Sequence, residues 1–297
     1  MALCGGPRTS KPESLPRNWP RSSQEDIDEK PNRKIKIGSD QQFEFHDNSI
    51  KTSKYEIYNF LPKFLLEEFN PYAKIANCYF LLIAALQTIP WISNTSGIPT
   101  YLLPLSVVVA INAVFQILED IKRHRADTEA NSSETETFNR ASSQFQSTKW
   151  SEVVVGDFIR ITSRQIIPAD IMILSVAEQN KSAPVGLCYV ETKSLDGETN
   201  LKIRNAMPNT LAKVGTSVAL QELAGEIEME HPNKLINSFS GILDIGQHGR
   251  EPIQANNLLL RGCVLRNTEW VLGIVVNTGH DTKVMMSNTE TKNKVSK

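Results

Sequence analysis

Two long runs of uncharged, mostly apolar residues lie in the first half of the chain, at Ile75–Ile92 and Tyr101–Leu118. Each is about 18 residues long, so an α-helix rising 1.5 Å per residue would cross most of a 30 Å hydrocarbon layer. The connection between them is short, so the two helices must run antiparallel. We therefore predict a transmembrane hairpin with helices over residues 75–94 and 101–121. Two core helices of a soluble protein are the alternative, although such helices rarely lack charge on every face.

Basic residues flank both ends of this hairpin. Lys51, Lys54, Lys63 and Lys74 precede the first helix, and the sequence EDIKRHRAD follows the second. Because cytoplasmic flanks carry an excess of Lys and Arg, both ends of an integral, multi-pass protein are predicted to lie in the cytosol. Residues 51–74 mix aromatic and aliphatic side chains with charged ones, which predicts an amphipathic segment at the membrane surface.

The remainder of the chain separates into polar stretches and short apolar runs. Residues 1–50 are rich in Pro, Ser, Lys, Arg and Asp, so we expect them to be mostly disordered. A Ser/Thr-rich stretch after Asn131 is expected to be a linker, and residues 128–297 as a whole are expected to form a mainly β domain. Its β-branched runs are broken by turn residues, and residues 217–230 are expected to add a helix. The predicted fold class is therefore a mixed α/β membrane protein.

Composition narrows the possible chemistry. The formal net charge of -1 does not indicate a nucleic-acid partner. The four cysteines lie far apart without a CxxC pair, and the five histidines are scattered. A disulfide framework, a zinc site and any other metal site in this chain are therefore not expected.

One loop has the residues for catalysis. It reads KSLDGETNLK over residues 193–202 and follows a strand-like run. Gly197 permits backbone dihedral angles that other residues resist, while Asp196 and Thr199 can bond nearby backbone groups. Glu198 would then project from the tip, where it could orient a water molecule or accept its proton. Ordinary turn chemistry would also explain this sequence.

Polar residues also occur inside the predicted hairpin. Gln87 and Thr88 lie near the outer end of the first span, where an amide needs a partner, either another helix or a transported molecule. Pro90 removes a backbone donor and is expected to free the carbonyl of Leu86. Interhelical hydrogen bonding is the expected role of Asn77 and Asn112.

The order of the motifs resembles one family. Residues from about Ile50 to the end resemble the type-4 P-type ATPases, the phospholipid flippases. The matching stretches include NSIKTSKYEIYNFLPKFLLEEF, EDIKRHRADTEAN, IPADIMILS, GLCYVETKSLDGETNLK and RGCVLRNTEW. The DGET sequence at residues 196–199 resembles flippases more than ion pumps, which usually carry TGE-type loops.

The resemblance implies a mechanism. Residues 128–297 would be an actuator domain, a distorted jelly roll, whose loop meets an aspartyl phosphate held by another domain. It implies that Glu198 is catalytic, with Asp196, Gly197 and Thr199 shaping the loop. Gln87 and Thr88 would contact the lipid headgroup, and Trp91 departs from the smaller or acidic residue of many flippases.

The resemblance also implies partners. Phospholipid would move from the outer or luminal leaflet to the cytosolic leaflet, with ATP and Mg²⁺ bound by domains outside this chain. An accessory membrane β-subunit and the remainder of a pump polypeptide are further expected partners. The headgroup and the organelle stay open.

The chain contains no DKTG phosphorylation motif. We therefore expect that it neither binds ATP tightly nor hydrolyses it alone, although the resemblance implies that it belongs to an ATP-driven translocase. Two alternatives stay open, a piece of a P-type cation pump and a catalytically inactive, membrane-anchored regulatory protein.

Overall fold

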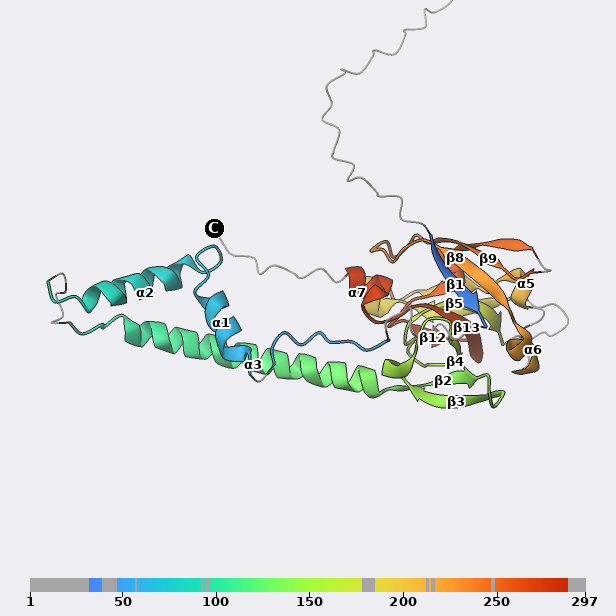
Figure 1. Cartoon of the computed structure of the whole chain (residues 1–297), viewed down its shortest axis with the longest axis horizontal. Coiled ribbons are helices and arrows are strands. Elements are labelled where there is room, and N and C mark those ends of the chain that lie inside the picture. Colours follow the sequence, from blue (N-terminus) through green and yellow to red (C-terminus); the bar gives the residue numbers. More distant parts are fainter. Residues whose placement is uncertain are drawn as a thin grey trace, which may run out of the picture.

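A computed structural model describes residues 32–38, 47–56, 58–91, 93, 97–177, 185–211, 214, 217–246 and 249–287. Three helices form an arm that extends from a β domain (Figure 1). The helices of the arm are α1 (Phe60–Glu68), α2 (Ile75–Gln87) and α3 (Leu102–Ser132). The structure therefore contains both an apolar helical part and a β-rich part, as the hydrophobic pattern predicts, although the lengths of the helices differ from the prediction.

A six-stranded antiparallel sheet forms the middle layer of the β domain. Its strand order is β11-β5-β13-β4-β2-β3. The strands are β2 (Glu134–Asn139), β3 (Gln144–Lys149), β4 (Phe158–Thr162), β5 (Asp170–Val176), β11 (Leu258–Leu259) and β13 (Trp270–Asn277). All seven residues of β5 are buried, so this strand is covered on both faces.

Two smaller sheets cover the two faces of the middle sheet. One has the order β1-β8-β9-β10 and the other the order β12-β6-β7. The strands of the first are β1 (Arg33–Ile37), β8 (Gly225–Met229), β9 (Ser240–Asp244) and β10 (Arg250–Gln254). The strands of the second are β6 (Leu187–Glu191), β7 (Leu201–Asn205) and β12 (Val264–Arg266).

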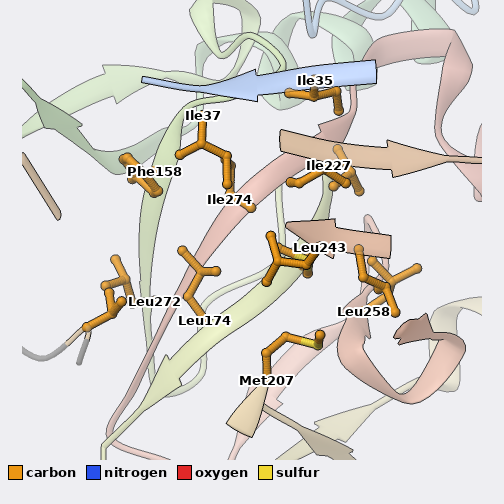
Figure 2. Close-up of a cluster of buried hydrophobic side chains, with 14 of the residues drawn as sticks. Ile35, Ile37, Phe158, Leu174, Met207, Ile227, Leu243, Leu258, Leu272 and Ile274 are labelled. Atoms are coloured by element: carbon orange, nitrogen blue, oxygen red, sulfur yellow. The ribbon is translucent and has the colours of Figure 1, made fainter. Parts of the chain in front are cut away.

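Two hydrophobic cores result, because successive side chains of a strand point to opposite faces. Met172 and Leu174 of β5 belong to the core under β1, β8, β9 and β10 (Figure 2). Ile171 and Ile173 of the same strand belong to the core under β6 and β12. The alternation along one central strand therefore separates the two cores.

Short helices connect these strands. They are η1 (Trp150–Glu152), α4 (Lys193–Asp196), α5 (Pro208–Leu211), α6 (Ser217–Glu222), η3 (Ala255–Asn257), η4 (Gly279–Asp281) and α7 (Lys283–Ser287).

Three expectations about the polar stretches are corrected. Within residues 1–50, Arg33–Ile37 forms β1 and pairs with β8, so disorder is wrong for this part, while residues 1–31 and 39–46 lie outside the described residues. The stretch after Asn131 is not a linker: β2 and β3 form an edge hairpin of the middle sheet. The helix expected over residues 217–230 ends at Glu222, and β8 begins at Gly225. In each case pairing with a distant strand determines the local structure.

The two helices of the predicted hairpin differ in length. Among the described residues, α3 alone is long and apolar enough to cross a membrane. It has 31 residues, or about 46 Å at 1.5 Å per residue, and extends past the predicted end at residue 121. Helix α2 has 13 residues, about 20 Å, and ends at Gln87 rather than at residue 94. Ile92 and residues 94–96 lie outside the described residues.

Pro90 accounts for the early end of α2, because it has no N–H with which to continue the helix. The sequence suggested that Pro90 frees the carbonyl of Leu86, and this expectation is wrong. The carbonyl accepts a hydrogen bond from the N–H of Ile89 at 3.2 Å. A tight turn at the end of the helix therefore supplies this carbonyl with a hydrogen-bond donor.

A fully buried carboxylate joins the three helices of the arm. Glu68 of α1 accepts hydrogen bonds from Asn77 of α2 at 2.8 Å and from Asn112 of α3 at 2.7 Å, and it pairs with Lys74. The interhelical role expected of the two asparagines is confirmed. Both amides meet on this one acceptor.

A second connection runs from the β domain along α3. The backbone N–H groups of Thr52 and Ser53 donate to Asp127 of α3 at 2.7 and 3.0 Å. Asn131 exchanges two hydrogen bonds with the backbone of Ile50. The segment before α1 is therefore fixed against the far end of α3.

At Gly273, β13 lies too close to β5 to leave room for a side chain. A Cβ atom at this position would lie 2.3 Å from Cγ2 of Ile171 and 2.5 Å from the carbonyl oxygen of Met172. The pairing of the two strands also shifts register here.

We predict that Gly273→Ala lowers the free energy of unfolding by about 1–3 kcal/mol, because the backbone carbonyl cannot yield without breaking the sheet. Urea unfolding of the full chain in detergent micelles measures this, with exposed Ser163→Ala as the control. Equal stability of the two variants would contradict the packing described here.

Candidate functional site

The loop with the DGET sequence connects two paired strands. β6 and β7 are antiparallel, with Glu191 opposite Leu201 at the end where the loop begins. The loop covers residues 192–200 and contains the short helix α4. Because β6 lies over a core with its Cys188 and Val190 buried, the base of the loop is rigidly placed.

Three side chains attach the loop to the domain. Leu195 packs against the core under β6 and β12. Ser194 donates to the carbonyl of Gly262 at 2.7 Å, and buried Thr192 donates to the carboxylate of Asp196 at 3.0 Å. The loop is therefore fixed at its beginning and along its first half.

Asp196 is the centre of the loop's hydrogen bonding. Its carboxylate accepts the N–H of Glu198 at 3.0 Å and Nζ of Lys202 at 2.5 Å, besides Thr192. The hydrogen bond from Lys202, followed by that from Glu198, lowers the pKa of Asp196 to about 2. The carboxylate therefore stays ionised and accepts hydrogen bonds from the loop and from β7.

Gly197 follows with a left-handed backbone, at a φ of 75°. A Cβ atom there would meet nothing within 4 Å. The preference for glycine comes from this backbone conformation, since a non-glycine residue at positive φ is strained. The space above the residue is open to another surface.

Glu198 stands at the tip of the loop. Its side chain is 59% exposed, and Nζ of Lys202 lies 3.2 Å from its Oε2. Thr199, the last residue of the sequence motif, is exposed beside it. Glu198 is therefore the carboxylate of this loop that can reach a group outside the domain.

Lys202 was not singled out by the sequence analysis. It lies on β7, and its ammonium group pairs with both Asp196 and Glu198. Hydrogen bonding to Asp196 is the main cause that raises the pKa of Lys202. Lys202 follows Glu198 by four residues, a spacing that predicts an ion pair on a helix. Here β7 begins between the two residues, so no local sequence pattern indicated this ion pair.

A buried polar cluster lies next to Gly262, to which the loop is attached. The sequence analysis did not predict this cluster. Asn48 is fully buried, donates to the carbonyls of Trp150 and Pro168, and accepts from Arg261 and the N–H of Gly279. Arg261 directly precedes Gly262, whose carbonyl holds Ser194. The N-terminal segment thus stabilises the part of the domain on which the loop rests.

Of the polar residues at the C-terminal end of α2, Gln87 contacts the start of the next helix. Gln87 donates to Oγ1 of Thr100 at 3.1 Å and accepts from the N–H of Tyr101 at 3.3 Å. Thr88 donates to the carbonyl of Ala85 at 2.7 Å, within its own helix. Gln87 therefore has protein partners, and Trp91 nearby is almost fully exposed.

The described residues contain no group of three or more His, Cys, Asp or Glu side chains that could hold a metal ion. The carboxylates of the loop also do not form such a group, because Lys202 lies between Asp196 and Glu198.

Comparison with known proteins decides the family. Residues 27–101 match the model of the phospholipid-translocating ATPase N-terminal region. The chain is 43% identical over 248 residues to phospholipid-transporting ATPase C887.12 of Schizosaccharomyces pombe, covering 83% of this chain and 19% of that protein. It is 41% identical to phospholipid-transporting ATPase ID of Homo sapiens over 252 residues, 85% of this chain and 20% of that protein. The chain belongs to the type-4 P-type ATPases.

The DRS2 phospholipid-transporting ATPase of Saccharomyces cerevisiae gives a third such match, with 41% identity over 84% of this chain. The chain spans about a fifth of the length of these curated relatives. In this type-4 P-type ATPase chain, the exposed loop and the apolar arm are the two features that call for a functional explanation.

The pKa of Asp196 provides a test of the loop geometry. Its ordinary value of 3.8 falls to about 2 in the folded chain, so the ionised carboxylate stabilises the loop above pH 4. That stabilisation is lost as the pH falls from about 4 towards 2. We predict an NMR titration midpoint near 2 for the side-chain carboxyl carbon of Asp196, assigned by its loss in Asp196→Asn. A midpoint near 4 would show that Lys202 and the Glu198 N–H do not hold this carboxylate.

Proposed function

We propose that this chain supplies the actuator module and a membrane hairpin of an ATP-driven phospholipid flippase. The observation that carries the proposal is the exposed Glu198 carboxylate at the tip of a loop whose other carboxylate is fully hydrogen-bonded. Membership in the phospholipid-transporting ATPases supports the reaction class. The target of Glu198 in this proposal is an aspartyl phosphate on another part of a pump.

The proposed chemistry is hydrolysis of that aspartyl phosphate. Glu198 accepts a proton from a water molecule while the water oxygen bonds to phosphorus. The bond between phosphorus and the aspartate oxygen breaks, releasing inorganic phosphate and restoring the aspartate. Covalent intermediates of this kind must be hydrolysed before another cycle, and a positioned general base contributes about 10²–10⁴-fold to such a step.

The surrounding residues suit supporting roles. Asp196 cannot easily act as the base, because its pKa of about 2 makes it a weak proton acceptor. Gly197 leaves open space for the approach of another domain. Lys202 restrains Glu198 from one side, and its positive charge would stabilise the negative charge of a phosphate group brought to the loop.

The apolar arm supports a place in the membrane. Large apolar side chains along α2 and α3 are exposed, among them Leu82, Leu103 and Phe115. Such a continuous apolar surface would be costly in water. We propose that α3 spans the bilayer and that the apolar run Ile75–Ile92, of which α2 is the helical part, forms the other arm of a hairpin with cytosolic ends. We also propose that α1 lies at the membrane surface.

The remaining parts of the proposed flippase lie outside this chain. ATP and Mg²⁺ would be bound by the phosphorylation and nucleotide domains, and an accessory β-subunit would associate in the membrane. Phospholipid would move towards the cytosolic leaflet. A cation pump is less consistent with the hairpin, because the runs Ile75–Ile92 and Tyr101–Leu118 contain no carboxylate that could bind an ion.

The first test replaces the proposed base. In a full-length pump where this chain substitutes for the matching segment of a related flippase, we predict that Glu198→Gln slows dephosphorylation about 10²–10⁴-fold, because the amide cannot accept the proton. Labelling with radioactive ATP would show accumulated phosphoenzyme and little turnover. Glu226→Gln is the matched control, since Glu226 also pairs with a lysine on the surface but lies on β8. Wild-type decay of the phosphoenzyme in Glu198→Gln would reject the proposed role.

The second test concerns the outer end of the hairpin. We propose that Gln87 and Thr88 contribute to headgroup selection, and that lipid competes with Thr100 and Tyr101 for the amide of Gln87. Loss of one hydrogen bond, worth about 0.5–1.5 kcal/mol, predicts that Gln87→Ala changes the ratio of activities with two phospholipids about 2- to 13-fold.

Lipid-stimulated ATP hydrolysis of the same full-length pump measures this ratio. Gln116→Ala is the control, because Gln116 lies near the middle of α3 and contacts Tyr55 rather than Gln87. An unchanged ratio in Gln87→Ala, at normal turnover, would show that Gln87 only links the two helices.

A further inference from the structure

Residues 50–55, which we call the strap, connect the β domain to α1 and lie along α3 (Figure 1). Four side chains of α3 bond to the strap, those of Gln116, Asp120, Asp127 and Asn131. Their spacings of four, seven and four residues place them on one face of the helix. The strap therefore lies on a polar face of α3.

The backbone of the strap is bonded to these side chains and has no helix or strand of its own. Four of its N–H groups donate to α3 side chains at 3.0 Å or less, those of Ile50, Thr52, Ser53 and Lys54. A backbone N–H exchanges its hydrogen with water when its hydrogen bond opens. Hydrogen exchange at these four groups therefore reports whether the strap lies on α3.

Thr52 bonds to Asp127 through both its backbone and its hydroxyl. Its N–H donates to Oδ2 of Asp127 at 2.7 Å, and its Oγ1 donates to Oδ1 at 2.5 Å. Thr52 is exposed, whereas Asp127 is only 8% exposed. An enzyme in solution can therefore reach the hydroxyl that holds the strap to a buried carboxylate.

The basic residues beside Thr52 already have carboxylate partners. The pairs are Lys51 with Glu56, Lys54 with Glu67, and Arg123 with Glu119. Arg123 lies one helical turn before Asp127 on α3. A negative group added to the Thr52 oxygen would therefore face the Asp127 carboxylate while these three cations are engaged elsewhere.

We propose that Thr52 is a phosphorylation site and that phosphate on its hydroxyl releases the strap from α3. The inference rests on the cytosolic placement proposed for the ends of the hairpin, because protein kinases and ATP are available in the cytosol. Lys51 and Lys54 on the two sides of Thr52 suit a kinase with an acidic substrate groove.

The transfer forms one bond and breaks one. Oγ1 of Thr52 bonds to the γ-phosphorus of ATP, and the bond from that phosphorus to the oxygen bridging the β- and γ-phosphates breaks. ADP leaves, and the hydroxyl proton passes to a base of the kinase. The kinase acts when the strap opens locally, since a bonded segment has to leave α3 to enter an active site.

Phosphate on Thr52 would oppose closure of the strap in two ways. It removes the hydroxyl donor to Asp127, and it adds a charge of about −1.5 to −2 beside a carboxylate, which repels it. Asp127 accepts two of the four N–H groups of the strap, so its loss as a partner affects Ser53 as well as Thr52. The connection between the β domain and α1 is then no longer held along α3.

Incubation of the full-length pump carrying this chain with protein kinase C, a kinase of basic substrates, tests the site. In the presence of Mg²⁺ and ATP, peptide mass spectrometry is expected to find phosphothreonine at residue 52, and Thr52→Val is expected to abolish that signal. Absence of phosphate at residue 52, in a reaction that phosphorylates a basic reference peptide, would reject the site.

Hydrogen exchange of the strap tests the release. In the same pump, Thr52→Glu replaces the hydroxyl by a carboxylate, as a substitute for phosphothreonine. Exchange at residues 50–54 is expected to accelerate about 10- to 100-fold, the factor that corresponds to loss of a hydrogen bond to a charged group. Ser142→Glu is the matched control, because Ser142 is exposed in the turn between β2 and β3 and does not belong to the strap. Its strap should exchange at the wild-type rate.

A second substitution separates charge repulsion from a general disturbance of the strap. Asp127→Asn removes the charge that the added carboxylate faces, while the amide oxygen still accepts from the N–H groups. Thr52→Glu combined with Asp127→Asn is therefore expected to exchange more slowly than Thr52→Glu alone. Normal phosphoenzyme formation in Thr52→Glu shows that the variant folds.

Three results would overturn the proposal. Wild-type exchange in Thr52→Glu rejects the release of the strap. Slower exchange shows that the added charge engages a cation such as Arg123 and tightens the strap, which rejects it too. Equally fast exchange in the single and double variants rejects repulsion by Asp127 as the cause. These readouts do not involve Glu198, so normal dephosphorylation in Glu198→Gln would reject the catalytic role and leave the strap result unchanged.

Discussion

The hydrogen bonds on Asp196 are the constraint on which the proposed site depends. Thr192, the N–H of Glu198 and Lys202 all donate to this one carboxylate, so the loop after β6 has a defined shape. Two neighbouring carboxylates thereby acquire different roles from their surroundings. Asp196 accepts the hydrogen bonds that shape the loop, while Glu198 stays exposed and pairs only with Lys202, at 3.2 Å. The chemistry proposed for Glu198 requires this division.

The rest of the domain makes that loop a stiff projection. β6 rests on a core shared with the middle sheet, whose central strand β5 is buried on both faces. Asn48 and Arg261 fix the N-terminal segment against the same region, and Asp127 fixes the following residues against α3. The loop, the domain beneath it and the helical arm are therefore joined by a continuous series of contacts.

Much of the fold could be predicted from the sequence, for identifiable reasons. The runs that became β4, β5 and β13 are rich in β-branched residues and bounded by turns, and α3 is a long apolar segment. β2 and β3 were missed because their sequences, ETETFN and QFQSTK, are as polar as a linker and form strands only by pairing at the sheet edge. β1 was missed because its partner β8 lies almost two hundred residues later.

The candidate site shows the same limit. The sequence of the loop indicated Asp196, Gly197, Glu198 and Thr199, but the contact between Asn48 and Arg261 joins residues far apart in the chain, and no local pattern predicts it. A structure of the full-length pump trapped with beryllium fluoride tests the role of Glu198 directly. We expect the Glu198 carboxylate to lie within hydrogen-bond reach, about 2.6–3.2 Å, of a water molecule in line with the beryllium. A Glu198 side chain that points into solvent away from the fluoride in that state would contradict it.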